Sequence, residues 1–187
     1  MLWVKPFKYL KCNTFMVREM SKITLPEVII KELRRRARGV GASIEEYLFD
    51  VLMSDEEPVE CAERYLEGAE ELVKEAQREL EERDLRQASE KIWGACALAI
   101  KAHALAKRGM KLESHRDLWK YKNEVAKELG EWVRAVFRQA DSMHKNFYDD
   151  VATREDVEDT LKDVEKLVTT IVKALRTRKA TDRSQGF

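Results

Sequence analysis

Three residue types that often reveal chemistry are scarce in this chain of 187 residues, which has three cysteines, seven glycines and three histidines. Cys12, Cys61 and Cys96 are odd in number and widely spaced, so they indicate neither a disulfide framework nor a zinc site. The glycines are scattered and form no phosphate-binding loop of the P-loop or Rossmann type. We therefore expect no metal and no cofactor, and a conventional metabolic enzyme is disfavoured.

Long apolar runs and an excess of one charge are also absent. Lysines interrupt the apolar residues at the start of the chain, and no later stretch approaches the ~20 apolar residues of a membrane span. Lysine plus arginine and aspartate plus glutamate number 35 each, so no overall field attracts a polyanion. The sequence favours a cytoplasmic protein without membrane contact, in which any nucleic acid binds a local basic face. The charged content of 37% is typical of proteins from hot environments.

The first third of the chain predicts a leader followed by a small module. Residues 1–20 are expected to be a leader, with a disordered segment and an over-extended gene start as the two alternatives. In residues 22–25 polar and apolar side chains alternate as on a half-buried strand, and Pro26 suits the first turn of a helix. Ser43 and Glu46 form a capping box that begins a second helix. Residues 21–55 thus resemble a ribbon-helix-helix module, the DNA-binding unit whose strand pairs with that of a second chain.

The resemblance to a ribbon-helix-helix module implies a set of nucleic-acid contacts. Lys22 and Thr24 would point from the two-stranded ribbon into the major groove, and the backbone at Ser43 would meet a phosphate. Arg34 and Arg35 belong to the most basic patch of the chain. A solvated helix face is the plain alternative for this patch.

The remainder of the chain predicts a helical bundle. After an acidic break at residues 54–58, apolar residues recur at helical spacing over about 58–82, 85–107, 121–147 and 153–176. Short loops between such helices are typical of an antiparallel four-helix bundle, here spanning residues 57–176, with a flexible tail at 177–187. The predicted fold is all-α, a four-helix bundle preceded by a small strand-helix-helix segment.

Three local strings in this bundle resemble the archaeal PaREP family: residues 91–95 (KIWGA), His115 with residues 118–119 (LW), and residues 144–148 (HKNFY). The family is similar to the HEPN superfamily, whose helical bundles often dimerise and whose active members cut RNA without metal through an Arg-x(4–6)-His motif. The resemblance implies a homodimer that binds other macromolecules, DNA or RNA among them.

Arg138 and His144 meet the spacing of that motif, with five residues between them. The resemblance implies that His144 is a general acid or base, that Arg138 holds the scissile phosphate, and that Asn146 adds a hydrogen bond. Six residues along a helix place Arg138 and His144 about 120° apart around the axis and ~9 Å apart along it, so they would converge only across a dimer. A histidine anchoring the turn after it, and a solvated arginine, are the alternatives.

Three hypotheses of function follow from the sequence. The first is a homodimeric interaction or nucleic-acid-binding protein of the PaREP type. The second is a metal-independent endoribonuclease of the HEPN type, acting as a toxin or in defence. The third is a nucleotide-binding bundle without catalysis.

Overall fold

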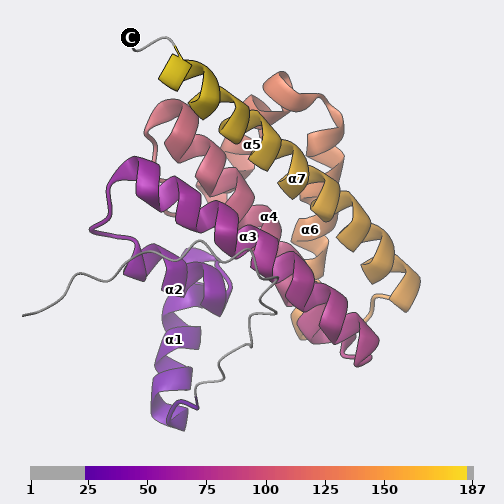
Figure 1. Cartoon of the computed structure of the whole chain (residues 1–187). Coiled ribbons are helices and arrows are strands. Elements are labelled where there is room, and N and C mark those ends of the chain that lie inside the picture. Colours follow the sequence, from indigo (N-terminus) through magenta and orange to yellow (C-terminus); the bar gives the residue numbers. More distant parts are fainter. Residues whose placement is uncertain (1–23, 185–187) are drawn as a thin grey trace, which may run out of the picture.

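The computed structural model describes residues 24–184, and every regular element in that range is an α-helix (Figure 1). This arrangement agrees broadly with the helical bundle expected from the sequence. The helices are α1 Glu27–Val40, α2 Ile44–Leu52, α3 Pro58–Glu81, α4 Leu85–Arg108, α5 His115–Leu129, α6 Trp132–Asp149 and α7 Arg154–Ser184.

The strand predicted ahead of the first helix is wrong. Thr24 and Leu25 are described and lie outside any strand, whereas residues 22 and 23 lie outside the described range. A strand needs a neighbour that takes up its backbone N–H and C=O groups, and the described part of the chain offers none. Pro26 instead leads directly into α1, where its carbonyl oxygen accepts a hydrogen bond from Ile30 N at 3.1 Å. The segment is a pair of helices, the α1–α2 hairpin.

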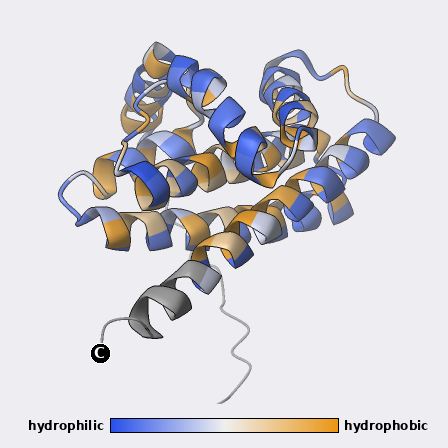
Figure 2. Ribbon diagram, turned by 90° about the horizontal axis from the view of Figure 1, so that it is seen from above, coloured by the Kyte–Doolittle hydropathy of each residue, from blue (hydrophilic) through white to orange (hydrophobic). Residues whose placement is uncertain are grey.

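Helix α4 occupies the middle of the bundle, with α3, α6 and α7 packed along it and α5 and α2 touching it as well (Figure 1). Small side chains on α4 let the neighbouring helices approach closely, and Trp93 fills the space beside α5 and α6 with no exposed surface. The surrounding helices carry apolar residues on one side and hydrophilic residues on the other (Figure 2). The buried alanines of α4 are Ala88, Ala95, Ala97, Ala99, Ala102 and Ala104.

The single helix predicted over residues 121–147 is two helices. Helix α5 ends at Leu129 and α6 begins at Trp132. Gly130 between them has φ +114°, a conformation that residues with a Cβ atom rarely adopt. Buried apolar residues occur on both sides of the break, so the helical periodicity continues across it and does not reveal it.

Buried ion pairs help to hold the α1–α2 hairpin against the bundle. Lys101 of α4 is only 2% exposed, and its Nζ lies 2.8 Å from the carboxylate of Glu46 and 2.5 Å from that of Asp50. The Tyr65 hydroxyl of α3 donates a hydrogen bond to Asp50. Burial alone would lower the pKa of Lys101, but the two carboxylates outweigh it and raise the pKa. These contacts fix α2, while α1 extends away from the bundle (Figure 1).

Candidate functional site

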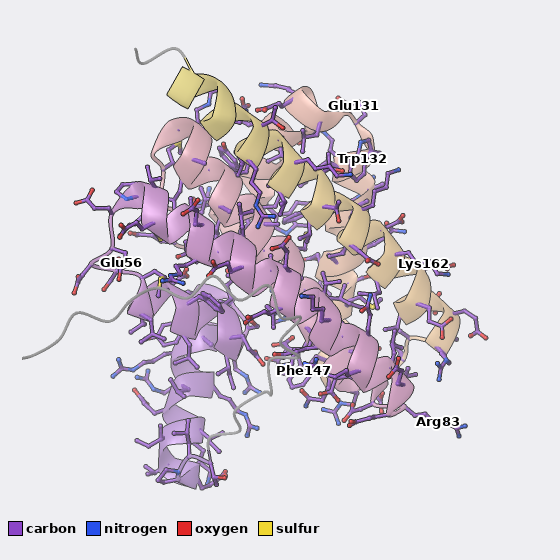
Figure 3. All side chains as sticks on the ribbon, in the orientation of Figure 1. Glu56, Arg83, Glu131, Trp132, Phe147 and Lys162 are labelled. Carbon is purple, nitrogen blue, oxygen red and sulfur yellow. The ribbon has the colours of Figure 1, made fainter. Side chains whose placement is uncertain are left out.

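A pocket lies between the α1–α2 hairpin and the bundle. Its volume is about 400 Å³, and its lining comes from α1 and α2 on one side and from the start of α4 and the end of α6 on the other. Phe147, at the end of α6, lies on the side of the bundle that faces the hairpin (Figure 3). The pocket therefore brings together residues that are more than 100 positions apart in the sequence.

Three arginines line this pocket, which we call the arginine pocket. The guanidinium of Arg38 lies 5.2 Å from the centre of the Tyr148 ring, and that of Arg86 lies 5.6 Å from the centre of the Phe147 ring. Arg86 Nε also donates a hydrogen bond to the Phe147 carbonyl oxygen at 2.9 Å. Arg34, one turn from Arg38 on α1, has no ion pair among the contacts described. Arg38 and Arg86 thus lie against aromatic rings, and most of their N–H donors have no partner among the described contacts.

The two acidic residues of the pocket have partners other than its arginines. Glu45 accepts a hydrogen bond from Lys91 at 2.5 Å, a lysine that also pairs with Glu75 at 3.1 Å, and Glu90 is paired with His144 at 3.0 Å. Among the described contacts, neither carboxylate forms an ion pair with Arg34, Arg38 or Arg86, and the three arginines outnumber the two carboxylates. In a chain with no net charge, this is a local concentration of positive charge next to aromatic rings.

His144 does not line the pocket, but it contacts two residues that do, Glu90 and Tyr148. Its Nδ1 shares a hydrogen bond with Glu90, its side chain is 16% exposed, and its ring lies edge-on to Tyr148 with centroids 5.7 Å apart. Burial raises the pKa of Glu90, and the hydrogen bond from His144 opposes that rise. The other ring nitrogen, Nε2, has no hydrogen bond among the described contacts.

A second histidine lies close to the first. His115 Nε2 is 2.8 Å from the carboxylate of Asp141, and the ring centroids of His115 and His144 are 6.4 Å apart, with Trp93 in contact with both. Burial would raise the pKa of Asp141, but hydrogen bonds from His115 and Lys145 lower it to about 2. His115 Nε2 also accepts a hydrogen bond from Trp119 Nε1 at 2.8 Å, and the other nitrogen, Nδ1, is buried without a partner among the described residues.

The residues predicted to form a nuclease site lie in different surroundings. Arg138 is exposed and lies near Lys122, whose pKa it helps to lower, after the larger effect of burial. Asn146 is buried: its Oδ1 accepts hydrogen bonds from the backbone N–H groups of Val151 and Ala152, and its Nδ2 donates one to Ser89. No described contact joins Arg138 to His144 or Asn146. Their roles in catalysis stay predictions.

The residues predicted to contact nucleic acid also lie in different places and do not form one surface. Arg34 lines the arginine pocket, whereas Arg35 is bound to Glu32 on the same helix at 2.7 Å. Ser43 is buried and its hydroxyl oxygen caps α2 by accepting a hydrogen bond from Glu46 N. Thr24 is exposed but belongs to no strand, and Lys22 lies outside the described residues. Of this set, only Arg34 lines the pocket.

Sequence patterns gave no sign of Arg86 or Glu90 as site residues. They are separated by four positions on α4 and therefore share one helix face, but nothing in that spacing indicates that α1 packs opposite them. Tyr148 entered the sequence analysis only as part of the string at residues 144–148, and its side chain is 44% exposed. Only the folded arrangement of α1, α4 and α6 reveals this site.

Neither a metal site nor a membrane-spanning helix is found in the described part of the chain. No group of three or more histidine, cysteine, aspartate or glutamate side chains there has the arrangement of a metal site. Among the helices, none is both long and apolar enough to cross a bilayer.

Comparison with known proteins places the chain in a family. The model of the archaeal PaREP1/PaREP8 family matches residues 64–168, more than half of the chain. The chain belongs to this family. The match covers most of α3, all of α4, α5 and α6 and about half of α7, and it leaves out the α1–α2 hairpin. In this PaREP chain, the residues of α4 and α6 that line the arginine pocket lie within the matched region, and those of the α1–α2 hairpin lie outside it.

A solved structure has a similar fold. It is that of a protein from Sulfolobus solfataricus, which is 24% identical to this PaREP chain, with a TM-score of 0.52. The similarity covers 58% of this chain and 96% of the other. At this identity the likeness shows the fold alone. Among curated proteins, none matches the chain.

Proposed function

We propose that this PaREP protein binds single-stranded nucleic acid, whose phosphates enter the arginine pocket. The observation that carries the proposal is the convergence of Arg34, Arg38 and Arg86 on one pocket of about 400 Å³ beside the rings of Phe147 and Tyr148. Arginine presents a planar fork of donors that matches the oxygens of a phosphate group. The arrangement of cations around aromatic rings is typical of sites that bind single strands.

The size of the pocket supports a ligand with the dimensions of one or a few nucleotides. Pockets for small molecules usually have volumes of roughly 300–1,000 Å³, and the arginine pocket lies at the lower end of that range. A duplex is too wide to enter such a pocket, whereas a flexible single strand or a free nucleotide fits. A single strand has the advantage that further phosphates can reach basic groups outside the pocket.

Exchanging the pocket arginines should abolish most of the binding. Arg34→Gln with Arg38→Gln removes two charges from the pocket, and we expect the affinity for a fluorescein-labelled decauridylate to fall by at least about tenfold, because hydrogen bonds to charged groups contribute about 1.5–3 kcal/mol each. Fluorescence anisotropy at fixed salt measures this change. Arg35→Gln with Arg36→Gln is the matched control: it removes the same charge from the same helix, but from side chains bound to Glu32.

The two double variants distinguish binding in the pocket from binding to any positive charge on α1. Equal losses of affinity in both variants would mean that the strand binds along the basic helix and not in the pocket, and the proposal would fail. Competition by uridine monophosphate, with no additional gain for longer strands, would favour the nucleotide-binding bundle over nucleic-acid binding. If wild type shows no saturable binding of either ligand, the site has no such function.

Cleavage of RNA is a second candidate function, and the Glu90–His144 pair favours it. Glu90 fixes one ring nitrogen of His144, so the other is suited to remove the proton of a ribose 2′-hydroxyl. The 2′-oxygen would then form a bond to phosphorus while the bond to the 5′-oxygen breaks, and solvent would supply a proton to the leaving oxygen. The products would be a 2′,3′-cyclic phosphate and a 5′-hydroxyl.

In this case His144→Ala should reduce the cleavage of a labelled RNA in EDTA by at least about 100-fold, with helicity unchanged by circular dichroism. Arg138→Gln serves as the comparison. A loss with Arg138→Gln would show that this residue acts, from the same or a second copy, as the motif implies, whereas full activity would leave phosphate binding to the pocket arginines. Wild type without cleavage, or equal cleavage by His144→Ala, excludes this role.

The homodimer implied by the family resemblance is part of the same proposal. Its support is that large apolar side chains of the α1–α2 hairpin are exposed in the single chain. Monomeric soluble proteins seldom expose several large apolar side chains within one region of their surface. Two copies would give the assembly two arginine pockets.

A further inference from the structure

Exposed large apolar side chains are concentrated near the N-terminal end of the described chain. Outside this region they are few, namely Met110, Tyr148 and Val151. The α1–α2 hairpin and the start of α3 therefore have apolar surface that the bundle does not cover. The residues are Leu25, Val28, Ile29, Val40, Val51, Leu52 and Val59, of which Val28 is 70% and Leu52 is 68% exposed.

Most of these side chains form two groups at opposite ends of the hairpin. The first, the tip patch, consists of Leu25, Val28 and Ile29 at the free end of α1, on the side of the helix roughly opposite Arg34 and Arg38. The second, the junction patch, consists of Val51, Leu52 and Val59 around the connection between α2 and α3. Figure 3 shows Glu56, in that connection, far from the free end of α1.

The charges beside the two patches are opposite. Along the same face of α1, the tip patch is followed by the exposed Arg35 and Arg36, which share a single carboxylate, Glu32. The junction patch instead lies beside the acidic run at residues 55–57, whose residues are all exposed. One chain therefore carries an apolar patch with a positive border and another with a negative border.

We infer that a second copy of this chain covers both patches, with the tip patch of each copy on the junction patch of the other. This inference rests on the proposed homodimer and assigns its surface. In a two-fold pair each contact is made twice, so both apolar patches are buried in each copy. Arg35 and Arg36 of one copy then lie beside Glu56 and Glu57 of the other, which fixes the orientation.

A second copy of this chain fits better than an unrelated protein, because one chain carries both the tip patch and the junction patch that complements it. The apolar groups correspond in size, three on each patch, and the charges at their borders are opposite in sign. The arrangement also leaves the arginine pocket open, since the tip patch lies on the other side of α1. Binding of nucleic acid and pairing of two chains are thus compatible.

The mass of the full chain in solution, measured by light scattering during gel filtration, tests this surface. Wild type at about 10 μM should have twice the chain mass of 21.9 kDa. Val28→Glu with Ile29→Glu should have the mass of a single chain, because it buries two carboxylates in the apolar contact. Val151→Glu is the matched control: Val151 is 79% exposed, between α6 and α7, and the dimer should persist. Circular dichroism confirms that each variant is folded.

A charge exchange tests the orientation of the two copies. Arg35→Glu with Arg36→Glu, and separately Glu56→Lys with Glu57→Lys, should each weaken the dimer by at least about tenfold. All four substitutions in one chain should restore the affinity to near that of wild type. Failure of this restoration would overturn the proposed orientation.

The remaining outcomes show whether the proposed contact surface fails alone or together with the proposed homodimer. A monomeric wild type overturns both proposals, and a loss of stability in its Val28→Glu and Ile29→Glu variant would then show that another part of the same chain covers the tip patch. A dimeric wild type that stays dimeric with those two substitutions leaves the homodimer in place and overturns the surface inferred here.

Discussion

Replacing Lys101 with methionine should lower the free energy of unfolding by about 3–5 kcal/mol, because it leaves a buried carboxylate without its partner. Glu46 is 2% exposed, and Lys101 supplies its only described ion pair. The second carboxylate, that of Asp50, keeps the hydrogen bond from the Tyr65 hydroxyl and is partly solvated. The loss should therefore come chiefly from Glu46. Urea unfolding followed by circular dichroism measures it.

The loss should be similar from pH 6 to pH 9. The pKa of Lys101 is raised in the folded protein above its ordinary value of 10.5, so its contribution is fully present below that value and is lost only as the pH rises through the folded pKa. Lys162→Met, at an exposed ion pair on α7, is the control and should change stability by less than about 0.5 kcal/mol.

A second variant shows whether the buried charge is the cause. Lys101→Met together with Glu46→Gln should recover part of the loss, since the uncompensated charge is gone. A loss below about 1 kcal/mol in Lys101→Met would mean that water or another cation reaches Glu46. The ion pairs would then not be what holds the α1–α2 hairpin in place.

Asn146→Ala should lower the free energy of unfolding by about 3 kcal/mol. The side chain is buried and makes three hydrogen bonds, which fix the connection between α6 and α7 to α4. Its removal leaves two backbone donors and the hydroxyl of Ser89 without this partner, at a cost of about 1 kcal/mol each. Asn123→Ala, at a half-buried asparagine of α5, is the control and should lose less than about 1 kcal/mol.

The same substitution separates a structural from a catalytic role for Asn146. If the protein cleaves RNA and Asn146 only packs the connection, cleavage by the folded fraction of Asn146→Ala should stay within about threefold of wild type. A stable Asn146→Ala protein with greatly reduced cleavage would contradict this and support the phosphate contact that the family resemblance implies.

The helices of the bundle were predictable because their signals are local. In α3, Cys61, Tyr65 and Ala69 recur at four-residue steps and are all buried. At the start of α7, the Thr153 hydroxyl accepts a hydrogen bond from Asp156 N, as expected of an N-cap. Such patterns depend only on residues within two or three turns of one another, so the sequence contains all the information they need.

The errors arose where the structure depends on more distant groups or on one backbone angle. Alternation at residues 22–25 is compatible with a strand, but pairing requires a second strand that the described chain does not offer. The break at Gly130 depends on a φ of +114°, and a glycine inside an apolar pattern does not by itself indicate a break. The capping box at Ser43 formed only in part, because Glu46 extends to Lys101 and does not turn back to the start of its helix.

Of the residues that line the arginine pocket, the sequence predicted a binding role only for Arg34. Arg34 lies in a basic run that is visible in the sequence, but Arg35 beside it points elsewhere and binds Glu32. Arg86 and Glu90 join the site because α4 packs between the hairpin and α6, which no local pattern specifies. Tertiary packing therefore determines which members of a charged surface form the pocket.

A crystal structure of the protein with a short oligouridylate bound tests the central proposal most directly. We expect a phosphate group within hydrogen-bonding distance of at least two of Arg34, Arg38 and Arg86, with a nucleotide against Tyr148. A strand bound along Arg35 and Arg36, or anywhere else with the arginine pocket empty, would contradict the proposal.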